Sequence, residues 1–135
     1  MRTNLQAVAT NRGRLLVAED DTELRTLLAL SLRRSGFEVV EAADGRALLE
    51  ALELTRSNRH SFDVVISDIR MPGYTTLDVL AGADETFARA PIVLITAFGD
   101  RRTHERALRL GAAAVLDKPV DLDELESAVS RLLGR

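Results

Sequence analysis

Five polar side chains stand at the ends of short aliphatic runs, and their types suit chemistry on a phosphoryl group. They are Glu19, Asp20, Asp68, Thr96 and Lys118. Three neighbouring carboxylates repel one another, which raises their pKa values unless a cation lies among them. An oxygen-only site with few protein ligands suits Mg²⁺, which keeps several of its waters. A metal ion, an ammonium, a hydroxyl and a carboxylate are the groups that hold a transferring phosphoryl group.

Asp68 is the residue around which this set is arranged. The run Val64–Ile66 before it predicts a strand that is buried on both faces. The proline and glycine of Met71-Pro72-Gly73 after it predict a turn. A carboxylate at the end of such a strand can act as a nucleophile and form an acyl phosphate. Thr96 can then donate a hydrogen bond to a phosphoryl oxygen.

The choice of basic residues singles out Lys118. Of the 18 Lys and Arg residues, 17 are arginine, and Lys118 is the one lysine. A compact ammonium and a planar guanidinium are not equivalent beside a small anion. This asymmetry supports a role for Lys118 at the site.

These side chains meet at one edge only if the strands are parallel. Strands are expected at 14–18, 37–41, 64–66, 92–95 and 112–116, and helices at 22–35, 45–54, 76–83, 100–110 and 122–133. The alternation predicts an α/β fold with a parallel sheet and crossover helices on both faces. Ligands of such sheets bind beyond the carboxyl ends of the strands. Asp21 is expected to cap the first helix.

Composition indicates one domain of 135 residues, with residues 1–13 as a polar tail and 14–135 as the folded unit. A net charge of -3 gives no reason to expect nucleic-acid binding. The absence of cysteine excludes a disulfide framework and a thiolate metal site. No apolar stretch has the length of a membrane span or the pattern of a signal peptide, so a cytoplasmic location is expected.

Four segments, taken together and in this order, resemble the receiver domain of two-component response regulators. They are LLVAEDD, DVVISDIRMPG, VLITAFGD and AVLDKP. The resemblance covers roughly residues 14–135 and is greatest to bacterial receivers of the NtrC type. It implies a flavodoxin-like, doubly wound fold with strand order 2-1-3-4-5 and a cis peptide bond before Pro119.

The resemblance also implies a role for each site residue. Asp68 would be the phosphoacceptor, and Thr96 and Lys118 would contact the phosphoryl group. The Mg²⁺ ligands would be Asp20, Asp68 and the backbone carbonyl of Arg70, with Glu19 as an outer-sphere partner. Such a domain is a signalling phosphoacceptor that assists its own phosphotransfer and dephosphorylation, rather than an enzyme with a separate substrate.

Partners follow from the same resemblance. The phosphoryl donor would be the phosphohistidine of a histidine kinase or phosphotransfer protein. A downstream protein or output domain would bind the helix at 100–110 and the strand after it, and homodimerisation stays open. The arginines of that helix can form this docking surface or merely a solvated face. His60 and His104 are expected to be solvated. No nucleic-acid or membrane contact is expected.

Four positions depart from the family pattern or bear on its tuning. Thr76 stands where glycine is usual, and Val115 stands where an aromatic switch residue is usual. Arg70 and Phe98 occupy positions that tune the phosphoryl lifetime in this family, and both are bulky. Val115 in particular leaves the usual route of conformational output in question.

Three other functions compete with this one. A phosphatase of the haloacid dehalogenase type needs a second acid two residues after the nucleophile, where this chain has Arg70. A dinucleotide-binding domain needs a glycine-rich first turn, where this chain has Glu19-Asp20-Asp21. A pseudo-receiver, which binds partners without phosphorylation, is the remaining alternative. Because only Gly134 and Arg135 follow the last helix, a stand-alone receiver and a fragment of a longer regulator both stay open.

Overall fold

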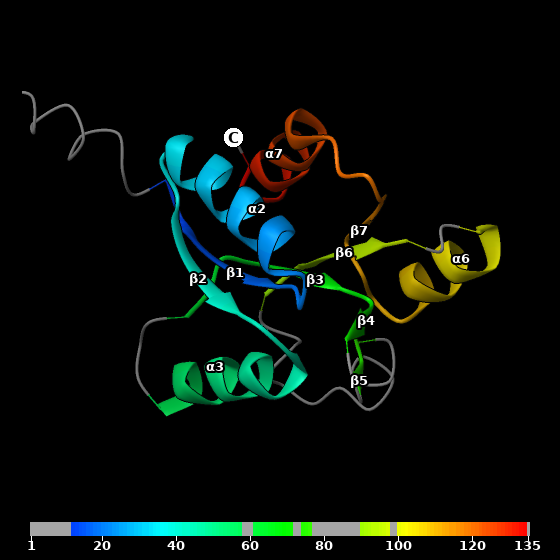
Figure 1. Cartoon of the computed structure of the whole chain (residues 1–135), viewed down its shortest axis with the longest axis horizontal. Coiled ribbons are helices and arrows are strands. Elements are labelled where there is room, and N and C mark those ends of the chain that lie inside the picture. The colour runs from blue at the N-terminus through cyan, green and yellow to red at the C-terminus, as the bar shows by residue number, and fades with distance from the viewer. Residues whose placement is uncertain (1–11, 58–60, 72–73, 77–89, 98–99, 135) are drawn as a thin grey trace, which may run out of the picture.

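A five-stranded parallel sheet forms the centre of the protein (Figure 1). The computed structural model describes residues 12–57, 61–71, 74–76, 90–97 and 100–134. The sheet consists of β1 (Arg14–Ala18), β2 (Glu38–Ala42), β3 (Val64–Asp68), β6 (Ile92–Thr96) and β7 (Ala114–Asp117). Its order is β2-β1-β3-β6-β7, which is 2-1-3-4-5 when the sheet strands are counted along the chain. The expected α/β fold and strand order are therefore confirmed.

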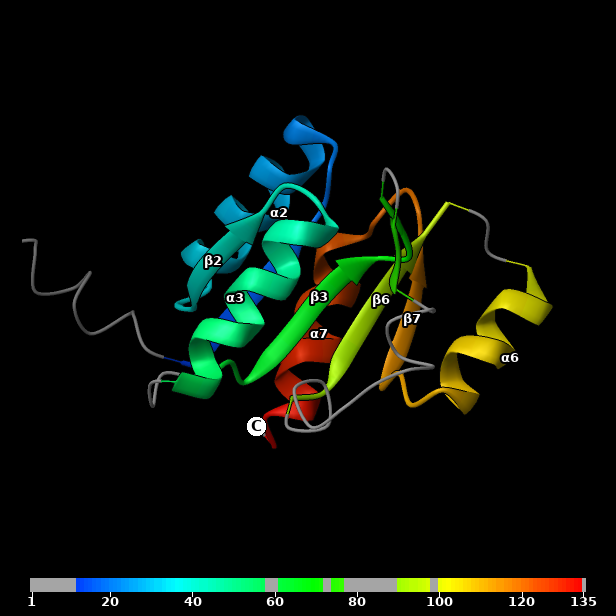
Figure 2. The same cartoon turned by 90° about the horizontal axis from the view of Figure 1, so that it is seen from below.

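Helices cover both faces of this sheet (Figures 1 and 2). They are α2 (Thr22–Arg34), α3 (Gly45–Ser57), α6 (Arg101–Arg109) and α7 (Leu122–Leu132). α2 and α7 lie together on one face, and α3 lies on the other. The helix expected at 76–83 lies outside the described residues apart from Thr76. Within the described part of the chain, no helix combines the length and the apolar character needed to cross a bilayer.

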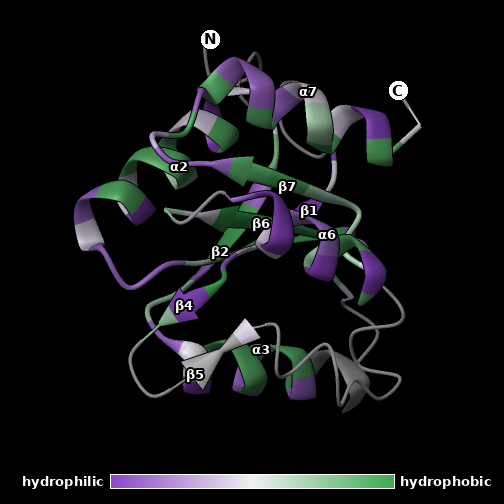
Figure 3. Cartoon of the chain, turned by 90° about the vertical axis from the view of Figure 1, so that its right-hand side faces the viewer, coloured by the Kyte–Doolittle hydropathy of each residue, from purple (hydrophilic) through white to green (hydrophobic). Residues whose placement is uncertain are grey.

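Alternating side chains of the strands divide the core into two layers. In β1, Leu15 and Val17 pack with α2 and α7, whereas Leu16 and Ala18 pack on the side of α3. This alternation is the period of two that a β-strand imposes. Every residue of β3 and β6 is buried, so the strands that lead to Asp68 and Thr96 are fixed on both faces. Hydrophobic colour runs along β6 and β7, whereas α6 is largely hydrophilic (Figure 3).

The helices that follow the strand ends begin at aspartate caps. The Asp21 carboxylate accepts a hydrogen bond from the Leu24 N–H at 3.1 Å, as the sequence predicted. Asp121 likewise accepts a hydrogen bond from the Glu124 N–H, also at 3.1 Å. Such caps satisfy backbone donors that have no partner inside the helix. They hold the loops at the carboxyl edge of the sheet close to the strand ends. The Lys118–Pro119 peptide bond is cis, as the resemblance implied.

Several element boundaries differ from the expectations. β2 begins at Glu38 rather than at residue 37, and β7 begins at Ala114 rather than at 112. α3 continues to Ser57, three residues past the expected end. An antiparallel pair that was not expected, β4 (Arg70–Met71) with β5 (Tyr74–Thr75), forms a separate small sheet beside the site.

Arg12, in the short segment before β1, contacts α7 and Phe37. The guanidinium of Arg12 bonds to Ser130 Oγ at 3.0 Å and pairs with Glu126 at 3.2 Å. It also lies 4.5 Å from the centre of the Phe37 ring, where a cation–π attraction operates. Of the expected tail at 1–13, residues 1–11 lie outside the described part, so the domain boundary at residue 14 stays a prediction.

Candidate functional site

Three carboxylates meet at the carboxyl edge of the sheet. Glu19, Asp20 and Asp68 each offer an oxygen within 4.8 Å of the others. They come together because β1 and β3 are parallel neighbours whose register ends at Ala18 and Ser67. Glu19 and Asp68 are buried, with 1% and 6% of their surfaces exposed, whereas Asp20 is exposed. The cluster therefore has two fixed acids at its base and one acid open to solvent.

Lys118 brings its ammonium to this cluster from the end of β7. Its Nζ lies 2.7 Å from Asp68 Oδ2 and 3.2 Å from Glu19 Oε1. The Lys118 N–H donates to the carbonyl of Thr96 at 2.8 Å, so the lysine backbone is tied to the end of β6. Thr96 itself is buried, with 2% of its surface exposed. The five residues singled out by the sequence thus lie at one edge of the sheet.

The charges of this cluster alter the pKa values of its members. Burial is the main reason why the pKa of Glu19 is raised to about 7, and the negative charge of Asp68 contributes to the rise. The Asp21 N–H, which donates to Glu19 Oε2 at 3.0 Å, and the Lys118 ammonium oppose that rise. Burial alone would lower the pKa of Lys118, but its hydrogen bond to Asp68 and the charges of both acids outweigh this and raise the pKa. The buried carboxylate of Glu19 therefore has a pKa near neutral pH.

The donor set fits a hard divalent cation. Among the described residues, Glu19 Oε1 is the one buried side-chain oxygen or nitrogen without a hydrogen-bond partner. Lys118 Nζ is close enough to attract it electrostatically, but its direction is not that of a hydrogen bond. One ammonium offsets three carboxylates only in part. An oxygen-only cluster with residual negative charge is the kind of site that Mg²⁺ occupies in proteins.

Two buried hydroxyl groups contact the main-chain carbonyl of Asp68, a contact that was not expected from the sequence. The Asp68 carbonyl oxygen is 2.8 Å from Thr76 Oγ1 and 2.9 Å from Ser67 Oγ. The two hydroxyl oxygens are 3.0 Å apart. A signal was present, because Thr76 departs from the family pattern and Ser67 interrupts an aliphatic strand. Both side chains are fully buried.

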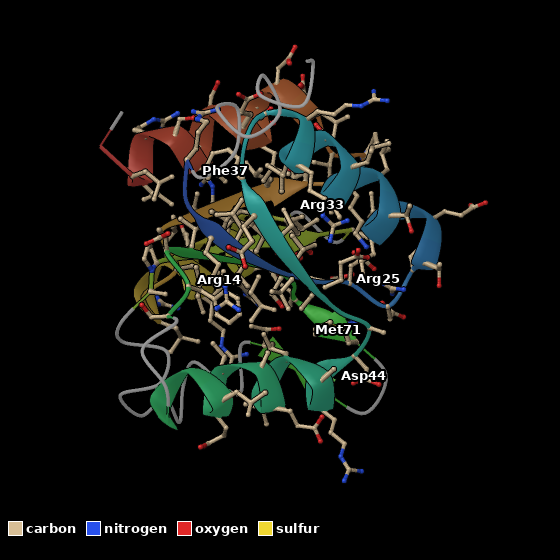
Figure 4. All side chains as sticks on the ribbon, turned by 90° about the vertical axis from the view of Figure 1, so that its left-hand side faces the viewer. Arg14, Arg25, Arg33, Phe37, Asp44 and Met71 are labelled. Atoms are coloured by element: carbon tan, nitrogen blue, oxygen red, sulfur yellow. The ribbon has the colours of Figure 1, made fainter. Side chains whose placement is uncertain are left out.

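Arg25 of α2 also contacts the backbone of the acid cluster. Its guanidinium donates to the Glu19 carbonyl at 2.8 Å and pairs with Glu41 of β2 at 3.3 Å. Arg33, near the end of the same helix, pairs with the same Glu41 at 3.1 Å. Figure 4 shows both arginines directed from α2 toward β2. Arg25 therefore links the loop that carries Asp20 to the edge strand.

His104 is not merely solvated, which corrects the expectation from the sequence. Its Nε2 lies 2.9 Å from Oδ1 of Asp117, the last residue of β7. The contact joins α6 to the strand end next to Lys118. Because the pair joins residues of two different elements, it could not be recognised from the sequence alone. His60 lies outside the described residues.

Of the positions linked to tuning and switching, Arg70 and Val115 belong to the described residues. The Arg70 N–H donates to Asp68 Oδ1 at 3.1 Å, which fixes the start of β4 against the carboxylate. The Arg70 residue is otherwise exposed, and the role of its carbonyl as a metal ligand stays a prediction. Val115 is half-buried and packs against the core layer on the α3 side. Phe98 lies outside the described part of the chain.

Comparison with known proteins identifies the family. Residues 15–130 match the family model of the response regulator receiver domain. The chain therefore belongs to the receiver domain family of two-component response regulators. This agrees with the fold and with the acid cluster at the carboxyl edge of the sheet.

Curated relatives of this chain are transcriptional regulators. The chain is 40% identical over 125 residues to the transcriptional regulatory protein PdtaR of Mycobacterium tuberculosis. It is 36% identical over 121 residues to the regulatory protein AtoC of Escherichia coli, an NtrC-like regulator. Each alignment covers 90% of this chain, but only 57% of PdtaR and 25% of AtoC. The chain thus spans about half or less of the length of these relatives.

Solved structures give the same assignment. The receiver domain of the Francisella response regulator 1452 aligns with a TM-score of 0.80 at 26% identity, covering 92% of this chain and 98% of that one. The chemotaxis response regulator CheY4 of Vibrio cholerae aligns with a TM-score of 0.75 at 28% identity, covering 90% and 99%. Both likenesses extend over nearly the whole domain.

Proposed function

We propose that Asp68 accepts a phosphoryl group from the phosphohistidine of a histidine kinase or phosphotransfer protein, in a reaction that needs Mg²⁺. The observation that carries this proposal is the 2.7 Å contact between Lys118 Nζ and Asp68 Oδ2 inside a cluster of three carboxylates. This contact places a fixed positive charge beside a buried nucleophile. Membership of the receiver family supports the same role.

Asp68 acts as the nucleophile in this proposal. One of its carboxylate oxygens forms a bond to phosphorus while the phosphorus–nitrogen bond of the donor breaks, and the electron pair returns to the imidazole. The product is an acyl phosphate on Asp68. The Lys118 ammonium then holds a phosphoryl oxygen, and the Thr96 hydroxyl donates a hydrogen bond to another.

Asp20, Asp68 and the Arg70 carbonyl would hold the metal ion, with Glu19 acting through a bound water. Mg²⁺ held there would supply positive charge that stabilises the phosphoryl oxygens. Burial makes the ionised form of Glu19 unfavourable, which is why its pKa is raised to about 7. A cation nearby would stabilise that ionised form, so Glu19 would favour metal binding. Asp68 keeps its orientation through the Arg70 N–H and the Lys118 ammonium.

The effect of phosphorylation would reach a downstream partner through the surface formed by α6 and β7. Exposed arginines lie along α6, at Arg101, Arg102, Arg106 and Arg109. Leu108 on the same helix is 52% exposed, which adds an apolar contact to the charged face. His104 couples this helix to the strand end beside Lys118 through Asp117. A downstream protein or output domain with an acidic surface would fit this face. We propose that the domain signals by this route in the cytoplasm, without direct nucleic-acid contact, and that any homodimer would also use this face.

The test is intact-mass measurement after incubation with acetyl phosphate. We expect one added phosphoryl group with Mg²⁺, and none after chelation of the metal or in Asp68→Asn. Asp63→Asn is the matched control, because Asp63 lies just before the start of the same strand and should leave labelling intact. A wild-type chain that stays unlabelled while binding a partner would favour the pseudo-receiver alternative.

A further inference from the structure

Ser67 and Thr76 meet at the main-chain carbonyl of Asp68. The Thr76 hydroxyl lies 2.8 Å from that oxygen, the Ser67 hydroxyl lies 2.9 Å from it, and the two hydroxyls are 3.0 Å apart. Neither side chain has any solvent exposure. A buried carbonyl contacted by two buried hydroxyls is a built arrangement, because each unpaired polar group there would cost free energy.

The three oxygens share two hydroxyl protons. Each hydroxyl can donate only one hydrogen bond, so at most two of the three contacts are hydrogen bonds at any moment. Either both hydroxyls donate to the Asp68 carbonyl, or one donates to it and the other donates to its neighbour. The Asp68 carbonyl is satisfied in every arrangement that leaves no proton unused. The unit is therefore self-contained and needs no water.

The position of this unit in the sheet explains why it is needed. The pairing of β1 with β3 ends at Ala18 and Ser67, so Asp68 is the first residue of β3 beyond that ladder. On the other side, the Ile69 N–H donates to the Ile95 carbonyl of β6 at 2.9 Å. The peptide group between Asp68 and Ile69 thus has a sheet partner for its N–H. The hydroxyls provide the partner for its carbonyl.

Thr76 binds two successive carbonyls. Its hydroxyl contacts the Asp68 carbonyl, and its N–H donates to the Ile69 carbonyl at 2.8 Å. The strand pair Arg70↔Thr75 lies directly beside these bonds. Thr76 therefore constrains the backbone between the carboxylate of Asp68 and the carbonyl of Arg70. A glycine, which the family usually has at this position, would keep the N–H bond but lose the hydroxyl.

We propose that Ser67 and Thr76 are positioning residues that fix the Asp68–Arg70 backbone for Mg²⁺ binding and phosphoryl acceptance. The inference rests on the proposed function in that it concerns the same site. It adds two fully buried hydroxyls that lie on the main-chain carbonyl of Asp68 and not in the carboxylate cluster. Their effect passes through the direction of the Asp68 carboxylate and of the Arg70 carbonyl.

The test compares variants that separate the hydroxyl from the shape of the side chain. Thr76→Val keeps the branched shape and removes the hydroxyl, whereas Thr76→Ser keeps the hydroxyl and removes a methyl group. Ser67→Ala removes the other hydroxyl, and the double variant removes both. Val129→Ala is the stability control, because Val129 is buried in α7 within the opposite core layer. Mg²⁺ affinity is measured by titration calorimetry, and the rate of labelling by acetyl phosphate is measured in parallel.

We expect Thr76→Val to weaken Mg²⁺ binding roughly three- to tenfold, the effect of one neutral hydrogen bond. The double variant should weaken it more, Thr76→Ser should stay near wild type, and Val129→Ala should lower the melting temperature without changing Mg²⁺ affinity. Wild-type Mg²⁺ affinity in Thr76→Val and in the double variant would overturn the proposal, as would equal losses in Thr76→Ser and Thr76→Val. If Thr76→Val does not fold, Ser67→Ala against wild type decides the question by the same titration.

Failure of this inference can be distinguished from failure of the proposed function. If the wild-type chain binds Mg²⁺ but takes no phosphoryl group, the proposed function fails, and the Mg²⁺ titration of the variants still tests the positioning role. If wild type, Thr76→Val and the double variant are labelled at equal rates and bind Mg²⁺ equally, the phosphoacceptor role stands and the positioning role is wrong.

Discussion

The ammonium of Lys118 lies 2.7 Å from Oδ2 of Asp68 and so joins the ends of β7 and β3, which are separated in the sheet by β6. The contact spans 50 residues of sequence. It holds a positive charge at the place where a phosphoryl group on Asp68 would carry its negative oxygens. Because Glu19 and Asp20 add two further carboxylates, the lysine alone does not balance the cluster. Balancing the cluster would take a second cation.

Replacement of Lys118 by arginine tests whether this geometry needs an ammonium. The guanidinium is wider and planar, so it should misplace the phosphoryl oxygens at a site that holds a compact charge. We expect Lys118→Arg to slow labelling by acetyl phosphate by on the order of 10²-fold, the usual cost of losing well-oriented charge stabilisation. Arg109→Lys, an exchange on the exposed face of α6, should have no effect. Labelling of Lys118→Arg within about twofold of wild type would show that the lone lysine is accidental.

Glu19 should make the stability of the metal-free protein depend on pH. Its pKa is raised from 4.5 to about 7 in the folded state, so the folded state binds more protons than the unfolded state between these values. The free energy of unfolding should therefore fall as pH rises from about 4.5 to 7. The loss is at most about 3.5 kcal/mol, since one pKa unit corresponds to about 1.4 kcal/mol. Urea unfolding in the presence of a chelator measures it.

Glu19→Gln isolates this effect from the other titrating groups. The amide cannot ionise, so the difference in unfolding free energy between wild type and Glu19→Gln should change across the same pH range in favour of the variant. Saturating Mg²⁺ should diminish that trend, because the cation stabilises the ionised carboxylate. Parallel pH profiles for the two proteins in chelator would contradict the account of Glu19.

Phosphorylation should change α6 more than α7. In receivers that switch through an aromatic residue, the residue at the position of Thr96 moves toward the phosphoryl group and the aromatic ring rotates into the vacated space. Val115 is β-branched and has essentially one stiff torsion, so it has little to rotate. A ligand shifts a two-state equilibrium only through its differential interaction with the two states. Amide hydrogen exchange with beryllofluoride, a mimic of the phosphoryl group, should therefore change mainly at 96–104 and only weakly at 113–117 and 122–133.

Phe98 is the side chain that we expect to move in place of the usual aromatic switch residue. Phe98→Ala should reduce the exchange changes at the start of α6 and leave phosphorylation of Asp68 intact. Comparable protection changes along the whole of α7 that persist in Phe98→Ala would refute this route of output.

The site was largely predictable from the sequence because its residues end strands. Aliphatic runs such as Val64–Ile66 and Ile92–Ile95 are typical of buried strands. Parallel strands bring their carboxyl ends to one edge of the sheet. Asp68 and Thr96 were therefore brought together by pattern alone. A role for Lys118 at the site was indicated by its being the one lysine in the chain. The cis bond before Pro119 was predictable only through the family resemblance.

Features that depend on contacts between elements were not predictable in the same way. The pair β4–β5 has two residues in each strand, which is too short for any periodic signal. The end of α3 was placed too early because Thr55 and Ser57 are weak helix formers, and the structure continues the helix through them. The pair of His104 with Asp117 and the hydroxyl contact of Ser67 with Thr76 each require the fold before they can be seen.

The most direct test of the phosphoacceptor assignment is to locate the phosphoryl group. Borohydride reduction converts an aspartyl phosphate to homoserine, which marks the modified residue permanently. Tryptic cleavage after Arg59 and Arg70 releases the peptide 60–70, which contains Asp63 and Asp68. Fragmentation after labelling with acetyl phosphate and Mg²⁺ should place homoserine at residue 68 and unmodified aspartate at residue 63. Homoserine at any other position, or its absence from a wild-type chain labelled with Mg²⁺ present, would contradict the account.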